Sequence, residues 1–156
     1  MGRSVLSEVM PRRQRTEIPA RAVDILTDKP TGFVATVGPR GVLSVTPVAL
    51  LYDGRKVRFS TTKDRQKYRN LLRDDRIAMA VPHRNNPNRY VELRGRARLT
   101  DDADRSFIDA IARHYMGVDR YPFDESGAER VIVTIEPERV SCPPIPLADA
   151  PPNAPG

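Results

Sequence analysis

The β-rich run at residues 42–60, VLSVTPVALLYDGRKVRFS, sets the class of structure expected for this chain. Its first half is rich in β-branched residues, Asp53-Gly54 is a strong signal for a hairpin turn, and residues 56–60 alternate between polar and apolar side chains. Pro47 interrupts the first half. Because proline has no N–H to donate to a β-ladder, it predicts a sheet edge, a bulge, or a position beside which something other than a strand lies.

Similar patterns extend on both sides of this hairpin. Runs bounded by turn residues predict strands, and amphipathic spacing among charged residues predicts helices. The expected strands span residues 32–37, 42–52, 56–60, 76–81, 89–99 and 130–135, and the expected helices span residues 18–28, 64–74 and 100–116. Since strands and helices do not alternate regularly, we expect an α+β fold, mainly β, with a six-stranded antiparallel barrel and flanking short helices.

The chain has 156 residues, enough for one domain with a substantial core. We expect a flexible basic tail over residues 1–17, a folded barrel domain over residues 18–141, and a proline-rich tail over residues 142–156. No apolar run approaches the roughly 20 residues that span a bilayer. The arginine pair near the N-terminus lacks the apolar stretch of an export signal, so we expect a cytoplasmic protein with no membrane partner.

Residues 60–67, STTKDRQK, run from the expected end of a strand into the start of a helix. They combine three hydroxyls, three cations and the free backbone N–H groups of a helix N-terminus. Such N–H groups and the helix dipole favour an anion, and the cations add charge-assisted hydrogen bonds. The segment is therefore a candidate phosphate site. It is also typical of an N-capped surface helix with solvated charges, and the local pattern leaves both interpretations open.

Other catalytic chemistry finds little support in the sequence. It contains no paired carboxylates, no serine–histidine pair and no cluster with metal-ligand spacing, and His83 and His114 are its two histidines. Cys142 is the single cysteine, so no intrachain disulfide is possible, and no histidine lies nearby in the sequence to activate it. We therefore expect no metal and assign no catalytic side chain.

The net charge of +6 comes from 26 basic and 20 acidic side chains. Such an excess suits either a polyanionic cofactor or nucleic acid. Arg94, Arg96 and Arg98 share one face of an expected strand, as in a nucleic-acid-binding stripe or in a solvated face with salt bridges. A nucleic-acid-binding barrel usually interleaves exposed aromatic residues with its basic ones. The expected strands offer little of this pattern, with Tyr90 as the main candidate. We therefore expect no nucleic-acid partner.

Six segments occur in the order of a known family. They are GFVATV at residues 32–37, VTPV at 45–48, STT at 60–62, KYRNLLRDDR at 67–76, ELRGRA at 92–97 and VTIEPERV at 133–140. Together they resemble the pyridoxamine-phosphate-oxidase-like family, whose fold is a split β-barrel. The ordered set is more specific than any one motif. The branch it most resembles uses coenzyme F420, an 8-hydroxy-5-deazaflavin, in place of flavin mononucleotide (FMN).

This resemblance implies how the cofactor is bound. The end of the third strand and the following loop would grip the cofactor phosphate, and the second strand would lie beside the tricyclic ring. The implied phosphate-binding residues are Ser60, Thr61, Thr62, Arg65 and Lys67, with Lys63 a weaker candidate, and the implied ring-binding residues are Thr46, Pro47 and Val48. The resemblance also implies a homodimer with two cofactor sites at the subunit interface, each completed by the partner chain.

The implied activity is that of an F420-dependent oxidoreductase, which transfers hydride between the deazaflavin and a small unsaturated or conjugated organic substrate. Two alternatives stay open. One is an FMN-dependent oxidoreductase of the pyridoxamine phosphate oxidase type, although the arginine- and histidine-containing C-terminal signature of that enzyme is not found. The other is a non-catalytic barrel that binds a cofactor or nucleic acid.

Overall fold

The computed structural model describes residues 16–145. Residues 1–15 and 146–156, which make up most of the two expected tails, lie outside the described residues. Two short 3₁₀ turns, Ala20–Ala22 and Pro39–Gly41, accompany the regular elements. These are α1 (Val23–Thr27), β1 (Thr31–Val37), β2 (Leu43–Tyr52), β3 (Val57–Thr62), α2 (Gln66–Arg73), β4 (Arg76–His83), β5 (Asn86–Asp101), α3 (Ser106–Met116) and β6 (Arg130–Ser141).

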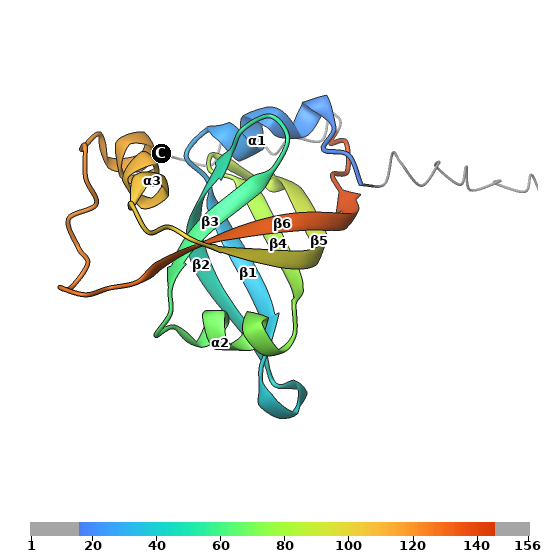
Figure 1. Ribbon diagram of the computed structural model, residues 1–156. Helices are drawn as coiled ribbons and strands as arrows, with labels where there is room; N and C mark the ends of the chain where they lie inside the picture. The colour runs from blue at the N-terminus through green and yellow to red at the C-terminus, as the bar shows by residue number, and fades with distance from the viewer. Residues whose placement is uncertain (1–15, 146–156) are drawn as a thin grey trace, which may run out of the picture.

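The six strands form one closed antiparallel barrel in the order β1-β2-β3-β6-β5-β4, with β4 pairing back onto β1 (Figure 1). This confirms the expected fold, including the small helices around the barrel. None of the helices within residues 16–145 has the length and apolarity that a membrane-spanning helix requires.

The barrel is opened between β2 and β3. These strands pair only from Leu50 opposite Phe59 to Tyr52 opposite Val57. The earlier part of β2 pairs with β1 alone, and residues 60–62 of β3 pair with β6 alone. Pro47 lies in this part of β2, which pairs with β1 and not with β3. The missing N–H of Pro47 therefore costs no hydrogen bond between β2 and β3. The edge expected at Pro47 is confirmed, and the divergence of the two strands creates the space in which the site lies.

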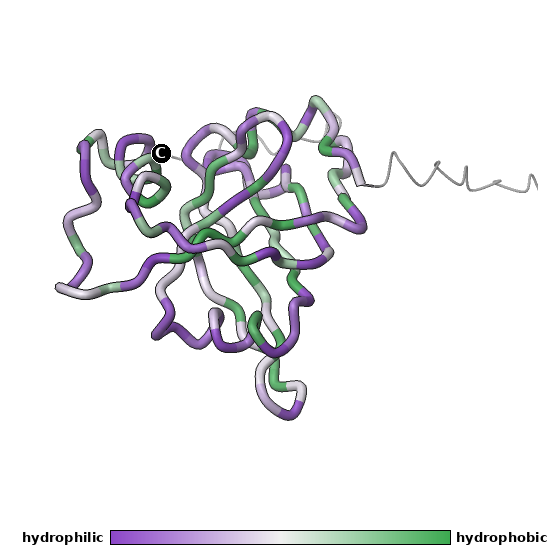
Figure 2. Tube along the Cα trace, in the orientation of Figure 1, coloured by the Kyte–Doolittle hydropathy of each residue, from purple (hydrophilic) through white to green (hydrophobic). Residues whose placement is uncertain are grey.

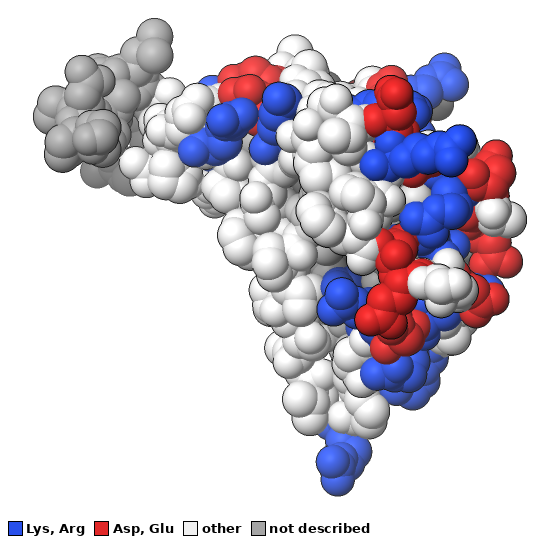
Figure 3. Space-filling view, turned by 90° about the vertical axis from the view of Figure 1, so that its left-hand side faces the viewer, with Lys and Arg blue, Asp and Glu red and all other residues white. Residues whose placement is uncertain are grey.

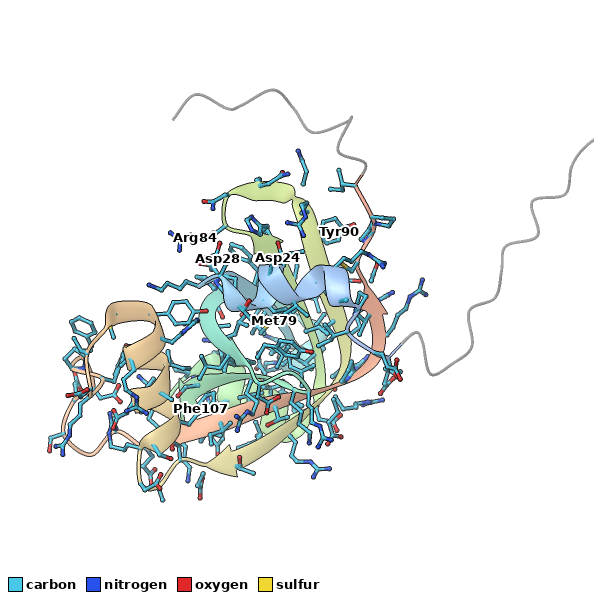
Figure 4. All side chains as sticks on the ribbon, turned by 90° about the horizontal axis from the view of Figure 1, so that it is seen from above. Asp24, Asp28, Met79, Arg84, Tyr90 and Phe107 are labelled. Carbon is cyan, nitrogen blue, oxygen red and sulfur yellow. The ribbon has the colours of Figure 1, made fainter. Side chains whose placement is uncertain are left out.

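The core fills the barrel interior, where the inward-facing residues of the strands meet (Figure 2). Phe59, Leu50 and Met79 are fully buried there. Helix α1 covers one end through the buried side chains of Ile25 and Leu26, and Met79 lies close beneath it (Figure 4). Helix α2 lies at the other end of the barrel in Figure 1, where Asn70 Nδ2 donates to Thr36 Oγ1 over 3.0 Å.

Helix α3 packs on the outside of the barrel and forms a second, smaller core. Phe107, Ile108 and Ile111 are buried there against apolar residues of β2 and β6. Figure 4 shows Phe107 at the junction of α3 with the barrel. This helix was expected to begin at Thr100, but β5 continues to Asp101 because Thr100 pairs with Ile132 of β6.

The cap of α3 comes from a residue that precedes the helix by several positions. Asp102 is buried, and its carboxylate accepts hydrogen bonds from the backbone N–H groups of Phe107 at 3.1 Å and Ile108 at 2.9 Å. Between the cap and the helix, Arg105 takes a left-handed conformation with φ of 62°. The N-cap and acidic first turn expected at residues 100–102 are therefore wrong in position, because β5 includes Thr100 and Asp101, and of these residues only Asp102 contacts the start of α3.

Candidate functional site

A groove of about 920 Å³ opens where β2 and β3 diverge. The part of β2 that pairs with β1 alone forms one wall, and the end of β3 with the following loop forms the other. Helix α3 contributes Ile108 and Ile111, and the loop over residues 117–129 joins α3 to β6 beside them. Lys67 of α2 and Arg130 at the start of β6 also line the groove, which therefore draws on parts of the chain that are far apart in sequence.

All the residues expected to bind the cofactor line this groove. They are Thr46, Pro47, Val48, Ser60, Thr61, Thr62, Lys63, Arg65 and Lys67. Those of β2 come from one wall, and those of the β3 end, its loop and the start of α2 come from the other. The structure therefore places the two expected subsites in one space.

The three hydroxyls are not equivalent. Burial alternates along β3, so Thr61 faces inward with Val57 and Phe59, whereas Ser60 and Thr62 are partly exposed. Thr61 Oγ1 is buried and has no hydrogen-bond partner within the described part of the chain. Thr62 Oγ1 donates to the carboxylate of Asp64. Ser60 is therefore the hydroxyl whose side chain is best placed to reach a ligand.

The three cations of the segment also differ. Lys63 Nζ lies 3.2 Å from the Asp101 carboxylate, so its charge is already paired. Arg65 is exposed and Lys67 is partly buried, and neither has an ion pair within residues 16–145. Burial, followed by the like charges of Arg65 and Arg130, lowers the pKa of Lys67. The groove therefore contains a partly desolvated cation that feels the charges of two further cations.

Helix α2 begins at this point without a side-chain cap. Its N-cap is Arg65, in an extended conformation with φ of −81° and ψ of 146°, and no side chain accepts a hydrogen bond from the first turn. A conventionally capped surface helix, the alternative interpretation of residues 60–67, is therefore not what the structure shows. The first N–H groups of α2 remain available to an anion in the groove.

Asp124 and Arg130 are groove residues that escaped the sequence analysis. Arg130, at the start of β6, donates from Nη1 to Ser60 Oγ at 3.3 Å and makes a two-point contact with the Asp124 carboxylate. Its guanidinium carbon lies 4.8 Å from the centre of the Tyr121 ring. No local motif signals these residues. Only the pairing of Thr62 with Arg130 brings the start of β6 to the end of β3.

Apolar side chains also line the groove. They are Pro47, Val48 and Ala49 of β2, Ile108 and Ile111 of α3, and, beside Arg130, Tyr121 and Phe123. The two aromatic rings pack edge to face, with centroids 5.6 Å apart. An apolar surface of this kind favours binding of a flat aromatic ring, whereas a purely polar ligand would bury little apolar area on it.

Residues considered for other functions lie elsewhere. Arg94, Arg96 and Arg98 form ion pairs with Glu92, with Asp75 and Glu138, and with Glu136, respectively. They form a salt-bridged outer face, which was one of the two interpretations. His83 is not among the residues that line the groove, and its Nε2 is 3.7 Å from the Asp24 carboxylate of α1. No cluster of metal-ligating side chains occurs in residues 16–145.

Comparisons with known proteins agree with this geometry. The family model described as pyridoxamine 5'-phosphate oxidase matches residues 18–142. A solved structure of an F420 reductase is 32% identical, with a TM-score of 0.71, and the match covers 80% of this chain and 98% of that one. No curated protein matches the sequence.

More distant structures share the fold. A putative pyridoxamine 5'-phosphate oxidase from Listeria innocua is 18% identical with a TM-score of 0.62, covering 78% of this chain and 94% of that one. A conserved hypothetical protein from Mycobacterium tuberculosis is 22% identical with a TM-score of 0.63, covering 85% and 88%. With the family match over most of the barrel, the chain belongs to the pyridoxamine 5'-phosphate oxidase-like family of split-barrel oxidoreductases that bind flavin or deazaflavin.

Proposed function

We propose that this protein is an F420-dependent oxidoreductase that transfers hydride between the deazaflavin coenzyme and a small unsaturated or conjugated organic substrate. One observation carries the proposal: the groove combines apolar side chains with Lys67, which is partly buried, lacks an ion pair among the described residues and feels the charges of Arg65 and Arg130. Clustered, partly desolvated cations are unfavourable until an anion joins them. A coenzyme with a flat ring and a phosphate would pack its ring on the apolar side chains and bind the cations with its phosphate.

The residues would divide between the phosphate and the ring. Ser60, Arg65, Lys67 and Arg130, with the first N–H groups of α2, would hold the phosphate. Thr46, Pro47 and Val48 would lie beside the ring, in the part of β2 that has no partner in β3. When bound, the reduced deazaflavin supplies a hydride, and the acceptor takes it together with a proton.

The protein's own contribution is binding, orientation and exclusion of water. Ile108, Ile111 and Phe123 are apolar residues of the groove, beside which an unsaturated acceptor would meet the ring. No histidine lines the groove within the described residues, and its carboxylates lie on loops. This agrees with a reaction in which the coenzyme performs the difficult step and the substrate is recognised mainly by shape.

The similar F420 reductase favours the deazaflavin, and the family model favours FMN as the alternative cofactor. An FMN-dependent oxidoreductase would use the same phosphate end. The non-catalytic nucleic-acid-binding barrel is less favoured because the outward arginines of β5 are paired with carboxylates. Cys142, a free and buried thiol, agrees with the cytoplasmic location that is part of our proposal.

A homodimer is part of the same proposal. The outward faces of β1 and β2 carry apolar pairs: Phe33 opposite Pro47, Ala35 opposite Val45, and Val37 opposite Leu43. Leu43 and Val45 are 72% and 63% exposed. Figure 3 shows an uncharged surface rising from the tip of the β1–β2 hairpin, with charged side chains gathered to one side. Because this surface adjoins the groove at Pro47, a second copy of the chain would cover it and complete the cofactor site.

The test is titration of cofactor-free protein with F420 and with FMN, followed by fluorescence. We expect micromolar or tighter binding of F420, weaker binding of FMN, and loss of binding in Lys67→Ala. Lys56→Ala, in the β2–β3 turn outside the groove, is the matched control and should bind as wild type. A preference for FMN would identify the protein as an FMN-dependent oxidoreductase instead. Binding of neither cofactor would leave the non-catalytic barrel as the better description.

A further inference from the structure

We propose that Asp124 is a positioning residue, whose carboxylate fixes the Arg130 guanidinium so that its remaining N–H groups face the phosphate end of the groove. The inference rests on the proposed function, because it concerns how that same site recognises its ligand. Asp124 lies in the loop between α3 and β6, and its carboxylate is directed toward the barrel.

The contact uses one edge of the guanidinium. Arg130 Nε donates to Asp124 Oδ2 at 2.8 Å, and Nη2 donates to Oδ1 at 2.6 Å. Nη1, on the other side, donates to Ser60 Oγ at 3.3 Å. A guanidinium has five N–H donors in a rigid plane, so two-point contact with Asp124 fixes the direction of the donors that remain. The bonds to Asp124 and Ser60 use three of these five N–H groups.

Two further contacts hold the arrangement. Arg105 Nη2 donates to Asp124 Oδ2 at 2.7 Å, which anchors the carboxylate from the start of α3. The Tyr121 ring covers one face of the Arg130 guanidinium. The side chains of Asp124 and Arg130 are each only 11% exposed, so the pair is shielded from water. A shielded, two-point ion pair retains its geometry better than an exposed one.

The charge balance of this cluster still favours an anion. Two arginines share one carboxylate, and Lys67 lies close enough to Arg130 for each to feel the charge of the other. Hydrogen bonding from Arg130, opposed by burial and aided by Arg105, lowers the pKa of Asp124, so the carboxylate stays ionised at neutral pH. Asp124 therefore aligns the site without neutralising it.

A second interpretation has the opposite consequence. If Asp124 merely occupied the place of a phosphate on Arg130, its removal would free the arginine and tighten anion binding. The structure favours positioning, because Asp124 contacts the Nε–Nη2 edge whereas the Nη1 that reaches Ser60 remains outside that contact. The two interpretations predict opposite changes in the affinity for an anion when Asp124 is replaced, so one experiment distinguishes them.

The experiment measures how much the phosphate of the ligand adds to the binding affinity of each variant. Full-length wild type and Asp124→Asn are titrated with F420 and with its phosphate-free ribityl chromophore, and in parallel with FMN and riboflavin. We expect Asp124→Asn to weaken binding of the phosphate-bearing ligands by about tenfold, the equivalent of about 1.4 kcal/mol, while binding of the phosphate-free ligands changes by less than about twofold. Asp124→Glu, which restores a carboxylate, should recover part of the loss. Asp74→Asn, which removes a carboxylate held by Arg76 outside the groove, should bind as wild type.

The outcomes separate this inference from the proposed function. Wild type that fails to prefer the phosphate-bearing ligands would overturn both. A normal preference in wild type that is unchanged or stronger in Asp124→Asn would overturn the positioning role alone. If Asp124→Asn does not fold, Arg105→Asn takes its place, since asparagine tolerates the left-handed conformation of that position. It should lose part of the preference for phosphate, and an unchanged preference would contradict the inference.

Discussion

Arg130 donates a hydrogen bond to Ser60 across 3.3 Å, although the two residues are 70 positions apart in the chain. The contact exists because β6 pairs with β3, so that Arg130 lies opposite Thr62. It adds a cation to the phosphate end of the groove that residues 60–67 do not contain. The candidate site is therefore assembled by the strand order of the barrel as well as by its most polar segment.

We predict that Arg130→Lys binds the phosphate-bearing cofactor about tenfold more weakly than wild type, since lysine keeps the charge but cannot contact Asp124 at two points and still reach Ser60. Fluorescence titration measures the loss. Arg139→Lys, in the exposed part of the same strand, is the matched control and should bind as wild type. Equal affinities for all three proteins would show that Arg130 is not part of the phosphate site.

The hairpin at residues 42–60 and the segment at residues 60–67 were predictable because their signals are local. Strand alternation, the Asp53-Gly54 turn and the polar run into α2 each depend on neighbouring residues. Pro47 was informative for the same reason, because a missing N–H constrains its own strand wherever that strand lies. The fold class and the residues of both subsites follow from these features together with the resemblance to a family.

Asp124 and Arg130 could not be predicted because their role depends on which strands become neighbours. Nothing near Arg130 in the sequence distinguishes it from the other arginines of the chain. The start of α3 was misplaced for a related reason. Asp102 looks like a cap beside Thr100, but pairing with β6 extends β5 to Asp101 and moves the helix to Ser106.

Cofactor affinity should fall as pH rises above neutrality, through the titration of Lys67. Burial and the neighbouring cations lower the pKa of this lysine from its ordinary 10.5. The protonated form attracts the phosphate, so affinity is highest below the lowered pKa and declines as pH passes through it. We expect Lys67→Arg to remove this decline, because arginine keeps its charge over the whole range.

The measurement is a series of titrations between neutral pH and the ordinary lysine value, with a phosphate-free ligand as the control. That ligand should show little of the decline. Superimposable profiles for wild type and Lys67→Arg would mean that Lys67 does not face the phosphate.

Loss of the Asp102 cap should weaken α3 and the groove wall that it forms. We expect Asp102→Ala to lower the free energy of unfolding by about 1–2 kcal/mol, because two backbone N–H groups lose their acceptor. Asp104→Ala is the matched control: it is exposed and accepts a backbone hydrogen bond from the N–H of Ser106, whereas Asp102 is buried and accepts two from the first turn. Urea denaturation monitored by circular dichroism compares the two, and a loss for Asp104→Ala as large as for Asp102→Ala would contradict the capping role.

The apolar surface of β1 and β2 gives the last prediction. Val45→Asp places a charge in the middle of this surface, where a dimer would bury it without a partner, so we expect the variant to be monomeric. Leu72→Asp, at a position on α2 that is exposed to a similar extent, should keep the assembly of wild type. Sedimentation equilibrium distinguishes the two states. Cofactor affinity should fall along with dimerisation in Val45→Asp, because the proposed site is completed by the second chain. A monomeric wild type that binds the cofactor with full affinity would show that one chain forms the whole site.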